Sequence, residues 1–364
     1  MTKPDGPLAG VRLIEMDAIG PVPLAGMLLS GLGCEIVRVA RPGQGAWSDV
    51  GASILHRGRL HVELDLKNAA DKAKLLDLVE LADGLIEGAR PGVMERLGLG
   101  PDECLARNPA LVYGRMTGWG QEGPLALRAG HDINYIAMTG ALHAIGERDA
   151  PPAVPLNLVG DYGGGTMFLA LGMVSAILAA RTTGKGQVVD AAMVDGAANL
   201  MSLFYAFLST GQWKDQRHSN LLDGSAPFYR CYTCRDGGHV AVGALEPQFF
   251  AILLEGLGIN ADEFDQNDPR CWPVMEARFT ETFASRTRDE WEAVFADRDA
   301  CVSPVLTMTE APVHPVNQAR GVFVTHDEVI QPAPAPRFSE TPTTIRPSVN
   351  ISIEEAATRW NKQP

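Results

Sequence analysis

Two segments of the sequence place titratable side chains where helices are expected to begin. The first is GHDINY, in which His131 and Asp132 precede the apolar run IAMTGALHAIG. The second is NLVGDYGGGT, in which Asp161 precedes three glycines and a further apolar run. A histidine and a carboxylate with a raised pKa can both serve as bases near neutral pH. On opposite faces of one carbon acid, one base removes a proton and the other returns it, which inverts the carbon centre.

The N–H groups at the start of the helix that follows His131 would support the same chemistry. They are free of partners within the helix and favour negative charge, so they suit a developing enolate oxygen. A simpler interpretation is that His131 and Asp161 are capping residues, because polar side chains are common at helix starts. The residue spacing by itself leaves both interpretations open.

Four arginines lie near the ends of expected strands: Arg38, Arg41, Arg90 and Arg96. Parallel sheets bind ligands outside the carboxyl ends of their strands, and guanidinium groups recognise phosphate well. The pattern therefore favours a ligand that carries a diphosphate. The alternative is that these arginines are solvated surface residues, as most arginines are.

The first 120 residues alternate between strand and helix patterns. Expected strands cover residues 11–17, 34–41, 84–89 and 110–120, and expected helices cover 24–33, 69–83 and 101–109. We interpret the polar stretch 55–68 as a connection. This alternation predicts an α/β fold, with a Rossmann-like parallel sheet covered on both faces. The first strand-to-helix turn reads AIGPVP and lacks G-x-G-x-x-G, which disfavours a nicotinamide or flavin enzyme. The G-x-S-x-G, P-loop and H-E-x-x-H motifs are also absent.

The remainder of the chain predicts a second unit and an extended return segment. The stretch 129–211 is mostly apolar and helical, with a strand near 187–194, and 228–244 predicts a hairpin around Asp-Gly-Gly. Two amphipathic helices are expected at 246–259 and 278–299. The proline-rich residues 332–348 predict a strap that lies on another part of the molecule. The C-x-x-C of Cys231 and Cys234 has no second pair, so we interpret these cysteines as structural thiols rather than zinc ligands.

Composition limits the class of protein. The 364 residues carry a formal net charge of −13, which argues against nucleic acid as a partner. The apolar run 167–180 is too short to span a bilayer, so we expect a buried core helix and no membrane insertion. The N-terminal MTKPDGPLAG lacks the pattern of a signal peptide, which predicts a cytoplasmic protein.

Several longer strings resemble one family. These are GPLAGVRLIEM, LGCEIVRVARPG, IEGARPGVMERLGLGPDE, RMTGWGQEGP, GHDINY, NLVGDYGGG, GKGQVVDAAMVDG and ALEPQF. Together they resemble the α-methylacyl-CoA racemases, a branch of the family III CoA-transferases, from near Pro7 to near Phe338. The resemblance implies an isomerase of lipid metabolism that inverts the α-carbon of 2-methyl-branched acyl-CoA thioesters by two-base proton transfer through an enolate.

The resemblance also implies roles for individual residues. His131 and Asp161 would be the two catalytic bases, Asn157 would accompany Asp161, and Glu246 of a partner subunit would pair with His131. The positions that match the family's CoA contacts are Arg41, Leu64, Asp65, Leu66, Lys67, Gly88, Ala89, Arg90, Arg96, Gly130, Asp132, Ile133, Asn134 and Tyr135. Family members more often carry an aromatic residue where this chain has Ala89.

The architecture implied is a large Rossmann-like domain and a smaller α+β domain in an interlocked homodimer, with active sites between subunits. We expect the large CoA-binding domain at residues 1–190, completed by 311–364, a helical linker at 191–224 and the small domain at 225–310. No cofactor or metal is expected, because coenzyme A is part of the substrate. Two alternatives remain: a family III CoA-transferase with Asp161 as nucleophile, and a non-catalytic acyl-CoA sensor.

Overall fold

The chain divides into two units. A computed structural model describes residues 6–43 and 51–361; residues 1–5, on which the expected lack of a signal peptide partly rests, lie outside this range. The first unit comprises Met1–Thr139, Pro155–Met201 and Ala319–Pro364, and the second comprises Gly140–Val154 and Ser202–Gln318. Residues 140–154 therefore group with the smaller unit, whereas the predicted boundaries place them in the large domain.

The first unit is built on a parallel sheet whose seven described strands run in the order β12-β3-β2-β1-β4-β5-β6. The strands are β1 (Arg12–Met16), β2 (Glu35–Ala40), β3 (Arg59–Glu63), β4 (Gly84–Glu87), β5 (Val112–Thr117), β6 (Gln187–Ala192) and β12 (Val349–Asn350). Five of them coincide with predicted strands. The strand order reverses between β1 and β4, and ligands of such sheets bind at this switch point.

Strand β3 corrects the sequence prediction, which interpreted residues 55–68 as a connection. Leu60 and Val62 are buried on one face of the sheet, and Arg59 is fully buried on the other. The Arg59 guanidinium pairs with the equally buried Glu15 of β1 at 3.0 Å. A Cβ atom on Gly26 would lie 1.9 Å from Glu15 Oε2, so glycine leaves the room that this ion pair needs. The strand was missed because its buried charge is neutralised by a residue far away in the sequence.

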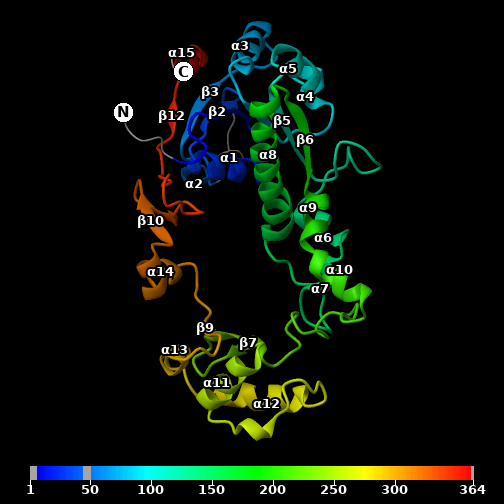
Figure 1. Cartoon of the computed structure of the whole chain (residues 1–364), viewed down its shortest axis with the longest axis vertical. Helices are drawn as coiled ribbons and strands as arrows, with labels where there is room; N and C mark the ends of the chain where they lie inside the picture. Colours follow the sequence, from blue (N-terminus) through cyan, green and yellow to red (C-terminus); the bar gives the residue numbers. More distant parts are fainter. Residues whose placement is uncertain (1–5, 44–50, 362–364) are drawn as a thin grey trace. The chain divides into compact units, whose positions relative to one another are not determined.

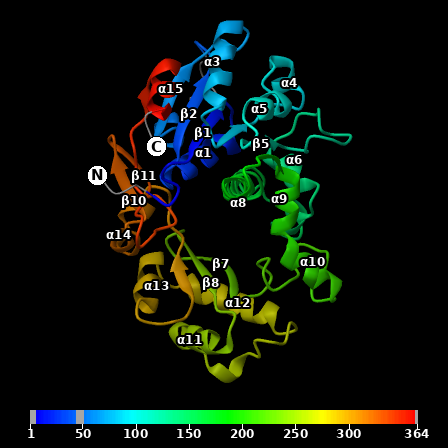
Figure 2. The same ribbon diagram turned by 45° about the horizontal axis from the view of Figure 1, so that its top comes forward.

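Helices cover both faces of the sheet (Figures 1 and 2). On one face, α1 (Pro21–Gly31) and α8 (Met167–Thr183) pack with strand side chains such as Leu13 and Ile86. On the other face, α3 (Ala69–Val79), α5 (Pro101–Arg107) and α15 (Ile353–Asn361) pack on side chains such as Ile14. The remaining described helices of this unit are α2 (Ala52–Leu55), α4 (Val93–Leu97), α6 (Asp132–Ala137) and α9 (Met193–Leu200).

Helix α8 is preceded without a break by the π-helix η1 (Leu158–Thr166). The resulting stretch, Leu158–Thr183, is 26 residues long and apolar enough to cross a membrane by length and composition. It is thus longer than the apolar run 167–180, which was predicted to be too short to span a bilayer. Leu169, Met173 and Ile177 of α8 are nevertheless buried against the sheet, as expected for a core helix of a globular unit.

The C-terminal segment returns to the first unit, as the strap prediction expected. The hairpin of β10 (Phe323–His326) and β11 (Val329–Pro332) leads into the irregular proline-rich stretch. There the Arg346 guanidinium donates to the carbonyl oxygens of Ser30 and Cys34 at 2.5 and 2.7 Å. Helix α15 then buries Trp360 completely in the sheet's core.

The second unit contains the antiparallel strands β7 (Tyr229–Thr233), β8 (His239–Gly243) and β9 (Val302–Pro304). The predicted hairpin is confirmed by β7 and β8. The predicted helix 278–299 is wrong in part, because α12 (Trp272–Phe283) ends before a separate α13 (Arg288–Phe295) begins. Further helices are α7 (Ala141–Ala144), α10 (Ser202–Ser209), α11 (Pro247–Leu257) and α14 (Pro315–Arg320), which leads out of this unit.

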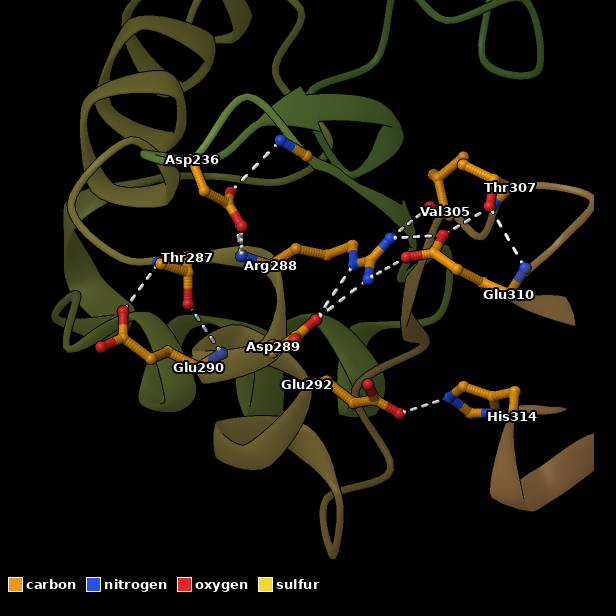
Figure 3. Close-up of polar contacts among 11 residues, drawn as sticks. Asp236, Thr287, Arg288, Asp289, Glu290, Glu292, Val305, Thr307, Glu310 and His314 are labelled. Carbon is orange, nitrogen blue, oxygen red and sulfur yellow. Dashed lines mark hydrogen bonds and ion pairs between the residues drawn. The ribbon is translucent and has the colours of Figure 1, made fainter.

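Helix α13 starts with a capping box that the sequence SRTRDE contained. The Thr287 N–H donates to Glu290 Oε2 at 2.7 Å, and the Glu290 N–H donates to Thr287 Oγ1 at 3.2 Å. Arg288, which follows Thr287, donates to both carboxylate oxygens of Glu310, at 2.9 and 2.8 Å (Figure 3). The bidentate pair fastens the segment that leaves β9 to the start of α13.

We expect the stability that the Arg288–Glu310 pair contributes to depend on pH. The pKa of Glu310 is lowered to about 2, chiefly by its hydrogen bonds with Arg288. A carboxyl whose pKa is lowered by folding stabilises the protein above its unfolded value, and this contribution disappears as the pH falls towards the folded pKa. Glu310→Gln should therefore lower the urea midpoint at pH 7, and the difference from wild type should shrink below pH 4.5. The exposed Glu281→Gln is the control; an equal effect of both variants would contradict the prediction.

Candidate active site

His131 is the N-cap residue of α6, so the capping interpretation describes its backbone correctly. Its N–H donates to Asn134 Oδ1 at 3.0 Å, and the side chain is exposed. The phenol of Tyr135 donates to the Gly130 carbonyl oxygen at 2.5 Å, and its ring packs edge-on against Trp119. A Cβ atom on Gly118 would overlap the Tyr135 ring, so this position requires glycine. The helix start is therefore fixed, and the His131 side chain lies at the surface.

Asp161 is not a capping residue. It is the fourth residue of η1, inside a π-helical segment of nine residues, and its side chain is partly buried. π-Helical segments are rare and often occur at functional sites. Its Oδ2 accepts a hydrogen bond of 3.3 Å from Asn157 Nδ2. A Cβ atom on Gly20 would lie 3.5 Å from the same oxygen, so the turn between β1 and α1 passes close to the Asp161 carboxylate.

The glycines of NLVGDYGGG allow η1 to approach α9 closely. A Cβ atom on Gly164 would lie 2.6 Å from the Ala197 nitrogen, and one on Gly196 would lie 1.9 Å from the Gly164 oxygen. Real Cβ atoms do not come this close to backbone atoms, so any larger residue would push the two helices apart. The glycines thus determine where the Asp161 backbone lies.

The pKa of Asp161 is raised above its ordinary value. Burial is the largest cause; the hydrogen bond from Asn157 opposes it, the Asp132 charge adds to it and His131 opposes it. Helix α6, which His131 caps, packs against η1, which carries Asp161. A raised pKa strengthens a carboxylate as a base.

Asp132 forms backbone contacts that the sequence did not predict. Its side chain is buried, and Oδ2 accepts hydrogen bonds from the N–H groups of Gly160 and Asp161 at 2.6 and 2.7 Å. The family resemblance predicts only a CoA contact for Asp132. The sequence shows an acidic residue directly after His131, which could have indicated such a role. Its hydrogen-bond partners, however, lie 28 and 29 residues away in the chain.

The loop after β4 carries Gly88 to Arg90, and helix α4 carries Arg96; all of these residues match CoA contacts. The buried Glu87 accepts the Ala89 N–H at 2.6 Å and pairs with Arg115 of β5 at 3.2 Å. Arg115 also pairs with Glu95 of α4 at 2.8 Å. The strand ends at the switch point and the loop beside it are therefore joined by one network of charges.

The other candidate CoA residues have varied surroundings. Arg38 and Arg41 both line a cavity of about 920 Å³, and Arg38 is otherwise buried and pairs with Asp17. Leu64 belongs to the core, while Asp65 and Lys67 are exposed. Ile133 and Asn134 lie on α6 and are exposed as well.

Glu246 belongs to the second unit, where it is the exposed N-cap residue of α11. Cys231 lies exposed on β7, Cys234 is buried just beyond it, and both are free thiols. Across the described ranges 6–43 and 51–361, no group of three His, Cys, Asp or Glu side chains is arranged to hold a metal ion.

Comparison with known proteins identifies the class. A family model described as CoA-transferase family III matches residues 8–349. A mouse protein named alpha-methylacyl-CoA racemase is 44% identical over 350 residues, which cover 96% of this chain and 91% of the relative. The human protein of that name is 43% identical over 337 residues, covering 92% and 87%.

The fold agrees with this match. The crystal structure of a CAIB/BAIF family protein from Brucella suis has a TM-score of 0.83, at 24% identity, over 98% of this chain and 99% of that chain. The chain thus has the same α/β fold, a parallel sheet with helices on both faces. The chain belongs to CoA-transferase family III.

The Glu87 network yields a prediction on stability. Burial raises the pKa of Glu87 from 4.5 to about 7. A raised carboxyl pKa stabilises the folded state below the unfolded pKa, and this stabilisation is lost as the pH rises through the folded pKa. Because one pKa unit is worth about 1.36 kcal/mol, a rise from 4.5 to about 7 corresponds to roughly 3 kcal/mol.

Between pH 4.5 and 8, the free energy of unfolding of wild type should therefore fall relative to that of Glu87→Gln. Urea denaturation at several pH values measures this difference. Glu95→Gln is the matched control, because the pKa of Glu95 is lowered and its effect should have the opposite sign. Parallel pH curves for wild type and Glu87→Gln would contradict the prediction.

Proposed function

We propose that this protein is an α-methylacyl-CoA racemase, which inverts the α-carbon of 2-methyl-branched acyl-CoA thioesters. The identity of 44% to a relative of that name over nearly the whole chain carries the proposal. It is supported by the placement of His131 at the start of α6 and Asp161 within η1, because these two segments pack together and both groups are suited to accept and return a proton. An acyl-CoA thioester is the substrate, and we propose a cytoplasmic location.

The proposed mechanism uses two bases and an enolate. The thioester carbonyl acidifies the α-proton, and one of His131 and Asp161 removes it while the other protonates the opposite face. Asn157 orients the Asp161 carboxylate through its hydrogen bond. The first N–H groups of α6 would hold the enolate oxygen, at the position where negative charge develops. No cofactor or metal takes part in this scheme.

The CoA moiety lies far from the reacting carbon and provides binding energy and position. We assign its binding to the loops after β2, β3 and β4, with Arg41, Lys67, Arg90 and Arg96 as the cations for its phosphates. The Glu87 network holds the loop that carries Arg90 through Ala89, and helix α4, which carries Arg96, through Glu95.

His131→Ala and Asp161→Asn test the two-base scheme. Each variant should lose about 10²- to 10⁴-fold in the rate of α-proton exchange, the usual contribution of one general base. The measurement is incubation of a chiral 2-methylacyl-CoA in deuterated water, with NMR detection of deuterium at C2 and chiral analysis. Lys185→Ala, in the exposed turn before β6, is the control. Full exchange by either base variant would refute the scheme.

A CoA-transferase reaction is the second candidate, because the chain belongs to a family that carries this name. Asp161 would then be the nucleophile and form an acyl-aspartyl intermediate. Transfer requires an acceptor acid and makes the enzyme sensitive to hydroxylamine, whereas racemisation requires neither. Deuterium at C2 without any acceptor favours racemisation, and strict dependence on an acceptor favours transfer.

We also propose that two chains form an interlocked homodimer in which Glu246 of one subunit pairs with His131 of the other. An exposed apolar stripe on α8, formed by Met167, Leu171 and Leu178, supports a large interface. Leu171→Glu with Leu178→Glu should give monomers without racemase activity in sedimentation and exchange assays. Thr182→Glu, at the exposed end of the same helix, should remain dimeric; an active monomer would overturn this arrangement.

A further inference from the structure

The side chain of Asp132 forms an unusual buried connection. It points away from solvent, and a single oxygen, Oδ2, accepts hydrogen bonds from two consecutive N–H groups of η1. The second oxygen, Oδ1, is buried without a hydrogen-bond partner among the described residues. A buried carboxylate with only one oxygen satisfied is costly, so its presence calls for a reason.

The position of Asp132 in the chain supplies that reason. Asp132 follows His131 directly, and one of the two N–H groups that it binds belongs to Asp161. The Asp132 carboxylate therefore connects the residue next to His131 directly to the backbone of Asp161. Gly160 completes the link, because a Cβ atom there would lie 2.8 Å from Asp132 Oδ2 and displace it.

We propose that Asp132 is a positioning residue whose carboxylate fixes the separation and orientation of His131 and Asp161. The inference rests on the proposed function, since it concerns how the two bases are held. It goes beyond a contact with CoA, because the side chain acts on the protein's own backbone. A proton transfer between two fixed bases and one carbon is sensitive to displacements of about 1 Å, which can cost about 10²-fold in rate.

Asp132 also affects the strength of Asp161 as a base. The titratable groups that interact with the Asp161 carboxylate are Asp132, His131 and the phenol of Tyr135. The negative charge of Asp132 raises the pKa of Asp161, and His131 opposes this effect. Geometry and charge can be separated by mutation, because they depend on different properties of the same side chain.

Two substitutions remove the link. Asp132→Ala deletes the acceptor, and Gly160→Ala displaces it by steric overlap. In both variants we expect kcat for α-proton exchange to fall about 10²-fold while KM changes little, because CoA binding is assigned to other loops. Hydrogen–deuterium exchange by mass spectrometry should show faster exchange of the amides of Gly160 and Asp161 in Asp132→Ala. Gly160→Ala keeps the inference testable if Asp132→Ala does not fold.

Asp132→Asn removes the charge but keeps the link. The amide oxygen can occupy the place of Oδ2, and the amide nitrogen takes the place of the unpartnered Oδ1. Amide protection in η1 should therefore stay at the wild-type level. The low-pH limb of kcat/KM should move to lower pH, because loss of the neighbouring charge lowers the pKa of Asp161. A purely structural role would not move this limb.

Asp102→Asn, at an exposed position in the first turn of α5, serves as the matched control and should match wild type in every assay. Wild-type kcat and amide protection in both Asp132→Ala and Gly160→Ala would overturn the inference while leaving the racemase proposal intact. If wild type itself fails to exchange the α-proton, the proposed function falls. The amide exchange of η1 then still decides whether Asp132 holds the Asp161 backbone.

Discussion

The hydrogen bonds from the N–H groups of Gly160 and Asp161 to the Asp132 carboxylate are the constraint on which the site depends. A buried carboxylate must find donors, and here the donors are the backbone of a π-helix rather than a side chain. These bonds use the backbone N–H of Asp161, while its carboxylate accepts a hydrogen bond from Asn157. The same bonds hold a helical geometry that is rarely stable over nine residues.

Buried charge contributes to the architecture at two further places, each with its own partner. Glu15 pairs with Arg59 and thereby keeps a polar strand inside the sheet. Glu87 pairs with Arg115 and at the same time accepts the Ala89 N–H, which joins the switch point to the loop beside it. In both pairs an acidic side chain of a central strand accepts a hydrogen bond from an arginine of another strand. The sheet is therefore specified by matched charges as well as by apolar packing.

The two units carry different parts of the proposed chemistry. The first unit holds both candidate bases and the loops assigned to CoA, and the second presents Glu246 at the exposed start of α11. The chain that leaves β9 runs from the second unit back to the first. The bidentate hydrogen bonds between Arg288 and Glu310 hold the beginning of this segment against α13.

The sequence by itself determined the alternation of strands and helices, the hairpin of β7 and β8, and the strings that identify the family, because periodicity and turn residues are local properties. It did not reveal β3, since the charge of Arg59 suits a buried strand only beside Glu15, 44 residues away. Nor did it reveal the role of Asp132 or the π-helical form of η1. Those features depend on contacts between residues that are distant in the chain, and only the tertiary structure brings such residues together.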